Sequence, residues 1–301
     1  MDAISYVIGL AEVRGSVDKR CLFAGATEMK VPAYGETEAA FHFVLDGECT
    51  LELPDRQVPL RAGDAVLLAG SPAHVIRTPG LGRVRACVET PGSAFDTIRS
   101  PSGKAVTDIF CGHYAVGSGS GVLLLRSLPD PLVVSFDDAD EAVRTLAALM
   151  RAEALSEGPG TAAILDALCA ALLAMMLRRG DLPGIAPWTA VADRRIAATI
   201  DAVLQDPGAD WTLDRLAATA SMSRATFVRH FGKHTQTTVG AFVTGLRMMV
   251  AADLLTDPDR TVATVAGQVG YHSESAFTRA FRETTGVTPG RYRRSRRSRQ
   301  A

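Results

Sequence analysis

Residues 261–281 read TVATVAGQVGYHSESAFTRAF and residues 212–231 read TLDRLAATASMSRATFVRHF, so one pattern occurs twice near the end of the chain. In each copy a predicted first helix is followed by a short break and a serine, Ser223 or Ser273. Such a serine caps a second helix by accepting a hydrogen bond from one of its free N–H groups. Two helices joined by so short a break are typical of a helix-turn-helix, whose second helix enters the major groove of DNA.

The second helix of each copy has an apolar face and a polar face. The apolar face carries two phenylalanines one turn apart, Phe227 with Phe231 and Phe277 with Phe281. These rings are expected to pack the helix onto its partner. The polar face carries Arg229 in the first copy and Arg279 in the second. An arginine fork can make paired hydrogen bonds to guanine or phosphate, and the alternative for both arginines is a solvated surface without a ligand.

A predicted helix over Val239–Thr256 joins the two copies, whose serines lie 50 residues apart. Two reading helices held on one rigid rod would address successive major grooves, which lie about 34 Å apart on one face of DNA.

The chain has 301 residues and a formal net charge of −1, but the charge is unevenly distributed. Residues 189–301 hold 16 Lys and Arg against 10 Asp and Glu, a net charge of +6, whereas residues 1–188 carry −7. A basic third favours a polyanionic partner for that part of the chain. With 47% hydrophobic and 22% charged residues, the composition fits about two globular domains and excludes a disordered protein.

Residues 1 to about 95 show short apolar runs between Gly, Asp and Pro turns, which favours an antiparallel sandwich or barrel. The expected strands are Phe41–Leu45, Thr50–Leu53, Val66–Leu68 and Val84–Val88, followed by Val122–Arg126 and Leu132–Phe136. Two helices are expected next, one capped by Asp137 or Asp138 and ending near Ser156, the other from Thr161 to about Arg179. The second has a broad apolar stripe, so we expect this pair to mediate dimerisation.

The expected fold class is therefore α+β. It comprises a β-barrel domain over 1–136, a helical dimerisation pair and linker over 137–188, and an all-α domain with two helix-turn-helix motifs over 189–301. Within the last domain, helices are expected over 189–206, 212–219, 223–231, 238–256, 262–269 and 273–284, with a short turn after Pro289 and a disordered arginine-rich tail.

Nothing at the amino terminus has the pattern of a secretion signal, and no run of about 18 uninterrupted apolar residues occurs. The five cysteines are an odd number without the spacing of a disulfide framework. We therefore expect a cytoplasmic protein without a membrane partner.

Three stretches of the basic third resemble the DNA-binding domain of the AraC/XylS family of bacterial transcription regulators. They are SMSRATFVRHF, AFVTGLRMMVAADLLTD and VATVAGQVGYHSESAFTRAFRETTGVTPGRYR, and the resemblance covers about residues 193–294. It implies double-stranded DNA and RNA polymerase as partners. The base-reading positions that it implies are Ala225, Val228 and Arg229, with Arg224 nearby, and Glu274, Ser275, Thr278 and Arg279. Ala225 or Val228 could contact a thymine methyl group, and Glu274 could instead complement the helix dipole.

The stretches FHFVLDGECTLEL and VPLRAGDAVLLAGSPAH resemble a cupin barrel over about residues 1–97. His74 matches the later cupin histidine, but only His42 stands where enzymatic cupins carry a histidine pair, and Ala40 occupies the glutamate position. A complete iron-type site is absent, so dioxygenase or isomerase chemistry is not expected.

Two histidines and two cysteines in this domain form a candidate sensor: Cys21, His42, His74 and Cys87. Together they could bind zinc tetrahedrally, or the cysteines could act as a redox-active thiol pair. The pattern resembles the cupin-type AraC regulators that sense reactive chlorine through cysteine oxidation. The alternative is that the cysteines are small buried side chains and the histidines are polar core residues. Cys49, Cys111 and Cys169 are expected only to pack.

These observations predict a dimeric, sequence-specific DNA-binding transcription regulator whose cupin-like domain senses a small ligand, a metal or an oxidant. The alternative is a metal-dependent cupin enzyme with an accessory helical domain, which would need further ligands near His42 and His74.

Overall fold

The structure is a computed structural model that describes residues 2–80, 84, 86–117, 120–136, 140–179, 193–235 and 237–300, without the side chains of 296–300. The chain forms two compact units. One comprises Val13–Ala115 with Asp130–Met176, and the other comprises Met1–Glu12, Val116–Pro129 and Leu177–Ala301. The expected domains follow one another along the chain, whereas these units interleave.

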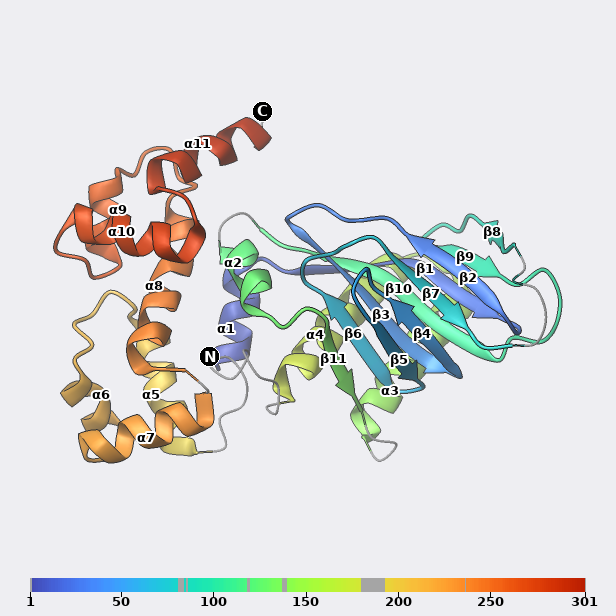
Figure 1. The fold of residues 1–301 in the computed structure, drawn as a ribbon, viewed down its shortest axis with the longest axis horizontal. Coiled ribbons are helices and arrows are strands. Elements are labelled where there is room, and N and C mark those ends of the chain that lie inside the picture. Colours follow the sequence, from blue (N-terminus) through green and yellow to red (C-terminus); the bar gives the residue numbers. More distant parts are fainter. Residues whose placement is uncertain are drawn as a thin grey trace. The chain divides into compact units, whose positions relative to one another are not determined.

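The first unit contains two β-sheets (Figure 1). The seven-stranded sheet has the order β11-β6-β3-β10-β1-β9-β8, and the four-stranded sheet has the order β2-β7-β4-β5. Their strands are β1 Arg14–Phe23, β2 Thr27–Val31, β3 Glu38–Asp46, β4 Glu48–Glu52, β5 Gln57–Arg61, β6 Asp64–Leu68, β7 His74–Thr78, β8 Val88–Thr90, β9 Asp96–Arg99, β10 Thr107–Ala115 and β11 Leu132–Ser135. Neighbouring strands pair antiparallel except β1 and β9, which are parallel.

The turn between β3 and β4 requires glycine. Gly47 has a φ of 74°, and a Cβ atom there would lie 2.3 Å from the Val106 carbonyl oxygen. Both the left-handed conformation and the close approach exclude a side chain. The turn thus fixes the register of β3, the strand that carries His42.

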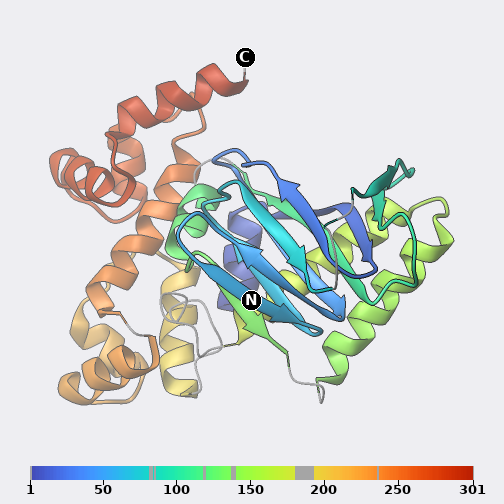
Figure 2. The same cartoon turned by 45° about the vertical axis from the view of Figure 1, so that its right-hand side comes forward.

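Helices α3 Glu141–Ser156 and α4 Thr161–Arg178 lie beside the sheets (Figure 2). The Tyr114 hydroxyl of β10 donates a hydrogen bond to the Cys169 carbonyl oxygen of α4 at 2.8 Å. The α3 side chain of Arg151 approaches Asp108 of β10, Nε to Oδ2 3.2 Å. These contacts attach the helical pair to the strands.

By length and composition alone, α4 could cross a membrane. It is also a core helix, because its side chains at 165, 169, 172, 173, 176 and 177 are buried. The buried stripe at helical spacing is what a helix packed on a sheet requires.

The second unit is helical. Its helices are α1 Ala3–Leu10, α2 Ser120–Ser127, α5 Arg194–Gln205, α6 Leu213–Thr219, α7 Arg224–Thr235, α8 Val239–Leu254, α9 Val262–Gln268, α10 Glu274–Thr285 and α11 Pro289–Gln300. Threonine side chains cap α6, α8 and α9, and Ser273 caps α10 by accepting from the Ala276 N–H. The predicted helices of this region are confirmed where the structure describes them.

Several expectations for the first 180 residues are wrong in detail. Val122–Arg126 lies in α2 and not in a strand. The run is buried on every side from Val122 to Leu125, and periodicity cannot distinguish such a run from a buried strand. Helix α1 was not predicted at all.

Other boundaries also differ. Asp140 caps α3, with its side chain accepting from the Val143 N–H, while Asp137 and Asp138 lie outside the described residues. The strand expected at Val84–Val88 begins only at Val88, as a short exposed edge strand. The tail after Pro289 forms α11 and not a short turn. The linker predicted at 183–187 lies outside the described residues.

Candidate DNA interface and sensor cavity

The two repeated units form helix-turn-helix motifs, α6 with α7 and α9 with α10. Phe227 and Phe231 are buried with ring centroids 5.6 Å apart, and Phe231 lies 5.6 Å from Phe242 of α8. Phe277 and Phe281 repeat this arrangement at 5.7 Å. The predicted apolar face is therefore the core of each motif, and it leaves the opposite face of α7 and α10 exposed.

The turn of each motif contains one residue in the left-handed region. It is Gly270 in the second motif, at φ 79°, and Ser221 in the first, at φ 52°. A Cβ atom on Gly270 would lie 2.5 Å from the Gly208 carbonyl oxygen, so glycine is needed there. Ser221 adopts a conformation that is uncommon for a residue with a side chain.

Most of the predicted base readers lie on the exposed faces. In α7, Ala225, Val228 and Arg229 are exposed; in α10, Glu274, Ser275 and Arg279 are exposed and Thr278 is half-buried. Among the described residues, Arg229 and Arg279 form no hydrogen bond or ion pair. Their guanidinium groups are free to donate hydrogen bonds to a ligand.

Two predicted readers have partners within the protein. Arg224 forms a bidentate ion pair with Asp214 of α6. The Ser275 hydroxyl lies 2.7 Å from that of Ser273, the cap of α10. Arg224 must break its ion pair with Asp214 before its guanidinium group can contact DNA, whereas Arg229 has no ion pair to break within the described part of the chain.

Helix α8 packs against helices of both motifs. Its Arg247 donates hydrogen bonds to the carbonyl oxygens of Pro207 and Ala209, each at 2.8 Å. The side chain thus anchors the segment between α5 and α6 to the connecting helix.

In the sheet unit, His42 of β3 and His74 of β7 meet in the core, with Nε2 atoms 2.7 Å apart. His74 Nδ1 lies 2.8 Å from the Pro72 carbonyl oxygen and must donate to it, because a carbonyl oxygen only accepts. Burial lowers the pKa of both histidines, and the neighbouring His74 lowers the pKa of His42 further. Both rings are therefore neutral. His42 therefore donates from Nε2, and its buried Nδ1 has no partner among the described residues.

The sulfur atom of Cys21 contacts residues other than Cys87, its predicted thiol partner. Its Sγ lies 3.7 Å from Cys111 Sγ and 3.3 Å from Met29 Sδ. Cys87 is half-buried and precedes β8, where burial and then the nearby Cys21 thiol raise its pKa. Burial also raises the pKa of Cys111.

The four predicted sensor residues do not converge on one point. Within the described chain, no three donor atoms from Cys21, His42, His74 and Cys87 come within 4.8 Å of one another. The histidine pair partly fits a metal, because His74 donates its other ring N–H to a carbonyl oxygen, as ligating histidines do. Two imidazoles alone do not make the closed four-ligand zinc site.

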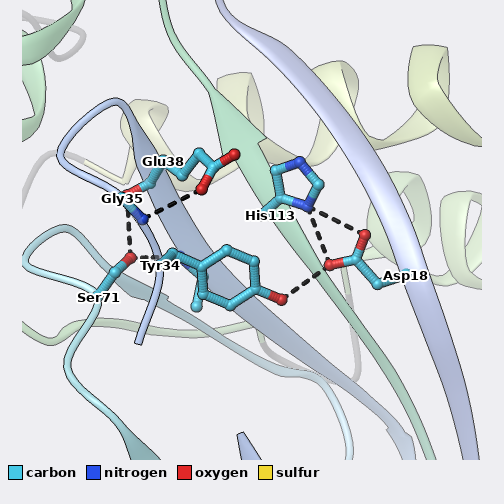
Figure 3. A network of polar contacts seen from close by, with 7 residues as sticks. Asp18, Tyr34, Gly35, Glu38, Ser71 and His113 are labelled. Carbon is cyan, nitrogen blue, oxygen red and sulfur yellow. Dashed lines mark hydrogen bonds and ion pairs between the residues drawn. The ribbon is translucent and has the colours of Figure 1, made fainter. Parts of the chain in front are cut away.

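Next to His42 lies a cavity of about 530 Å³ that sequence reasoning missed. Its wall includes Asp18, Tyr34 and His113, which form a network (Figure 3). The Tyr34 hydroxyl donates to Asp18 at 2.8 Å, and His113 Nδ1 lies 2.9 Å from the same carboxylate oxygen. This hydrogen bond to Asp18 raises the pKa of His113. No spacing in the sequence links these residues, since the pairing of β1 with β10 brings Asp18 and His113 together and Tyr34 comes from the segment between β2 and β3.

Comparison with known proteins agrees with this architecture. A family model described as Cupin matches residues 2–180, and one described as Helix-turn-helix domain matches residues 216–295. An uncharacterized HTH-type transcriptional regulator of Haemophilus influenzae is 31% identical, over 98% of this chain and 99% of its own. The chain belongs to the AraC family of helix-turn-helix transcriptional regulators.

Other relatives have similar names. The RCS-specific HTH-type transcriptional activator RclR of Escherichia coli is 29% identical to this AraC-family regulator, over 97% of each chain. The solved DNA-binding domain of AdpA in complex with a target DNA is 32% identical, with a TM-score of 0.34, over 35% of this chain and 96% of that one.

The AraC-family regulator is thus a DNA-binding transcription regulator with a cupin domain, as the sequence predicts. The relatives named above are transcription regulators, so they lend no support to the alternative of a metal-dependent cupin enzyme. The individual base readers and the sensor residues stay predictions.

Proposed function

We propose that the regulator reads double-stranded DNA with the exposed faces of α7 and α10. One observation carries this: Arg229 and Arg279 project from the reading helices of a doubled motif without partners in the described chain. Both belong to the part of the chain with a net charge of +6. A guanidinium group without a partner inside the protein breaks no hydrogen bond or ion pair when it binds guanine or phosphate.

The two reading helices are expected to differ in specificity. Around Arg279, α10 offers Glu274, Ser275 and Thr278, which can donate to or accept from base edges. On α7, Ala225 and Val228 offer only apolar contacts, with the exposed fraction of Val228 at 48%. We therefore expect α10 to supply most of the hydrogen-bonded base readout and α7 to read mainly through Arg229.

The cupin unit is the proposed sensor of a small ligand, a metal or an oxidant. His42 and His74 offer two neutral imidazoles, the form that binds zinc. A closed site with Cys21 and Cys87 requires both thiols to move toward the histidines. Zinc bound there would have a structural role, and its removal would free the thiols.

The thiols could respond to an oxidant without a metal. The Sγ atoms of Cys21 and Cys111 are 3.7 Å apart, and a disulfide needs about 2.05 Å. Hypochlorous acid and two thiols give a disulfide, water, chloride and a proton, so the oxidant takes both electrons. Cys111 is therefore a second candidate disulfide partner of Cys21, besides Cys87. Mass mapping of the oxidised protein tests which of the two forms the disulfide.

A covalent route connects the sensor to the reading helices. The chain leaves the large sheet at the end of β10, forms α2, and returns as β11. Helix α2 packs against α8, and Arg126 of α2 donates to the carbonyl oxygen of Thr285, the last residue of α10, at 3.3 Å. A change at β10, which carries Cys111, would act through α2 on both reading motifs.

We further propose a cytoplasmic homodimer that contacts RNA polymerase. The dimer is supported by large apolar side chains exposed on α3 and α4, namely Leu149, Leu155 and Ile164, at 53%, 73% and 45%. Burial of these side chains against a second copy of the chain would remove their apolar surface from water.

The test uses full-length protein and a random-sequence DNA library. Selected duplexes that share a site, with affinity that falls steeply as salt increases, are the expected result. Equal affinity for all duplexes, or affinity independent of salt, would refute the proposed function. For the sensor, Cys21→Ser is expected to abolish the response of a reporter gene to hypochlorous acid, whereas Cys169→Ser is the matched control.

A further inference from the structure

Three potential metal ligands lie together in the helical unit, apart from the cupin residues. His230 and His234 are one turn apart on α7, the reading helix of the first motif, with ring centroids 6.2 Å apart. Asp193, the N-cap of α5, faces them. All three side chains are half-buried.

The distances are close to those of a coordinated ion. His230 Nδ1 lies 3.2 Å from Asp193 Oδ2, and one ligand atom from each of the three residues lies within 4.8 Å of the others. Two ligands on a tetrahedral zinc, at bonds of about 2.0–2.1 Å, are about 3.3 Å apart. The first pair already has this separation, and His234 needs to approach by at most about 1.5 Å.

The chemistry of the set favours a borderline divalent ion. Two imidazoles and one carboxylate suit zinc and its neighbours cobalt and nickel, whereas calcium and magnesium prefer oxygen ligands alone. Three protein ligands leave a fourth position for water. Helical histidines at i and i+4 present their rings on one face, which is the spacing used in helical zinc sites.

Arg195 competes for the carboxylate. Its Nε and a terminal nitrogen lie 3.2 and 3.1 Å from the Asp193 oxygens. Its side chain is more than half exposed, so it can turn into solvent when an ion binds. Without an ion, the His230–Asp193 hydrogen bond alone already joins α7 to α5.

We propose that Asp193, His230 and His234 form a divalent transition-metal site, for which zinc is the natural occupant, joining the start of α5 to the first reading helix. The site is separate from the cupin histidines and does not depend on the proposed sensor. Because His230 follows Arg229, an ion here also fixes the helix turn that presents this reader and adds positive charge to it. Zinc is expected to stabilise the fold and to strengthen DNA binding.

The test starts from full-length, untagged protein stripped with a chelator. The His42→Gln/His74→Gln variant removes the cupin imidazoles, so that zinc bound by it reports on the new site. One equivalent of zinc and a tetrahedral cobalt spectrum are expected from this variant. Adding His234→Gln or Asp193→Asn should abolish both, whereas adding His272→Gln, an exposed histidine of the second motif, should leave them unchanged.

Asp193→Asn is the sharper substitution, because asparagine retains the N-cap while it removes the charged ligand. Saturable zinc binding that persists in both His234→Gln and Asp193→Asn overturns the proposal. Absence of saturable zinc binding to the His42→Gln/His74→Gln protein also overturns it and leaves a simple histidine–aspartate hydrogen bond. Neither result bears on DNA recognition by α10.

Discussion

Replacement of Arg279 by alanine gives the most direct test of how this regulator recognises DNA. The side chain is exposed on α10 and has no partner in the described chain, so its removal breaks no contact that stabilises the fold. Substitutions at such surface positions change the free energy of unfolding by less than about 0.5 kcal/mol. The whole effect should therefore appear in DNA binding.

The magnitude follows from the chemistry of the arginine fork. A bidentate arginine–guanine pair discriminates by about 1–3 kcal/mol, which corresponds to about a 5- to 150-fold loss of affinity for the selected site. The same substitution should make one base position tolerant of all four bases. A phosphate contact would instead weaken every duplex equally and reduce the salt slope by about 1.

Fluorescence anisotropy with the selected duplex and its single-base variants, at several salt concentrations, distinguishes these cases. Arg282→Ala, an exposed arginine at the far end of α10, is the matched control and should preserve the base preference. An Arg279→Ala protein that binds every duplex as tightly as the parent, with an unchanged salt slope, would refute the assignment of the exposed face as the interface.

Four further outcomes are expected. Asp108→Ala should lower the free energy of unfolding by about 3–5 kcal/mol in urea titrations, because it leaves the buried Arg20 without its bidentate partner at 2.8 and 3.1 Å. The control is Asp55→Ala, at an exposed ion pair, which should change the free energy of unfolding by less than about 1 kcal/mol. Burial, and then the neighbouring His74, hold the pKa of His42 below about 6.5, so the contribution of its neutral ring to stability is present above that pH and is lost as the pH falls. A loss of stability in acid that is as large in His42→Gln as in the parent protein would contradict this. The pKa of His113 is raised by its hydrogen bond to Asp18, so its contribution is present below about pH 6.5 and is lost as the pH rises, and His113→Gln should remove it from the pH profile of the urea midpoint. Ser273→Ala should cost about 1 kcal/mol of stability through loss of the α10 cap, measured by urea titration against the parent protein.

The helix-turn-helix motifs could be read from the sequence because their determinants are local. Ser273 caps the helix that begins at the next residue, and Phe277 and Phe281 are four residues apart on one face. Interactions over such short separations form in any fold that contains the helix. The same locality explains why the exposed position of Arg279 followed from the spacing alone.

The sheet unit was predicted less completely because its contacts are distant in sequence. Alternation and turn residues indicated a barrel, but they could not distinguish the buried run at Val122–Leu125 from a strand, since burial on all sides removes the periodicity. The strand predicted over Val84–Val88 begins only at Val88, because the valines that suggested a buried strand are exposed: Val84 is 51% and Val88 53% exposed, and β8 is a three-residue edge strand.

The two helix-turn-helix motifs and the basic charge of their domain follow from the amino-acid sequence, because capping, helical spacing and charge are properties of short segments, and the cupin follows from the resemblance of two stretches before them. Which side chains meet over long sequence separations depends instead on the fold: His42 meets His74 across 32 residues, Cys21 meets Cys111 across 90, and Asp18 meets His113 across 95. Strand register and helix packing set these pairs, and a shift of one residue along a strand would turn every side chain to the other face of the sheet.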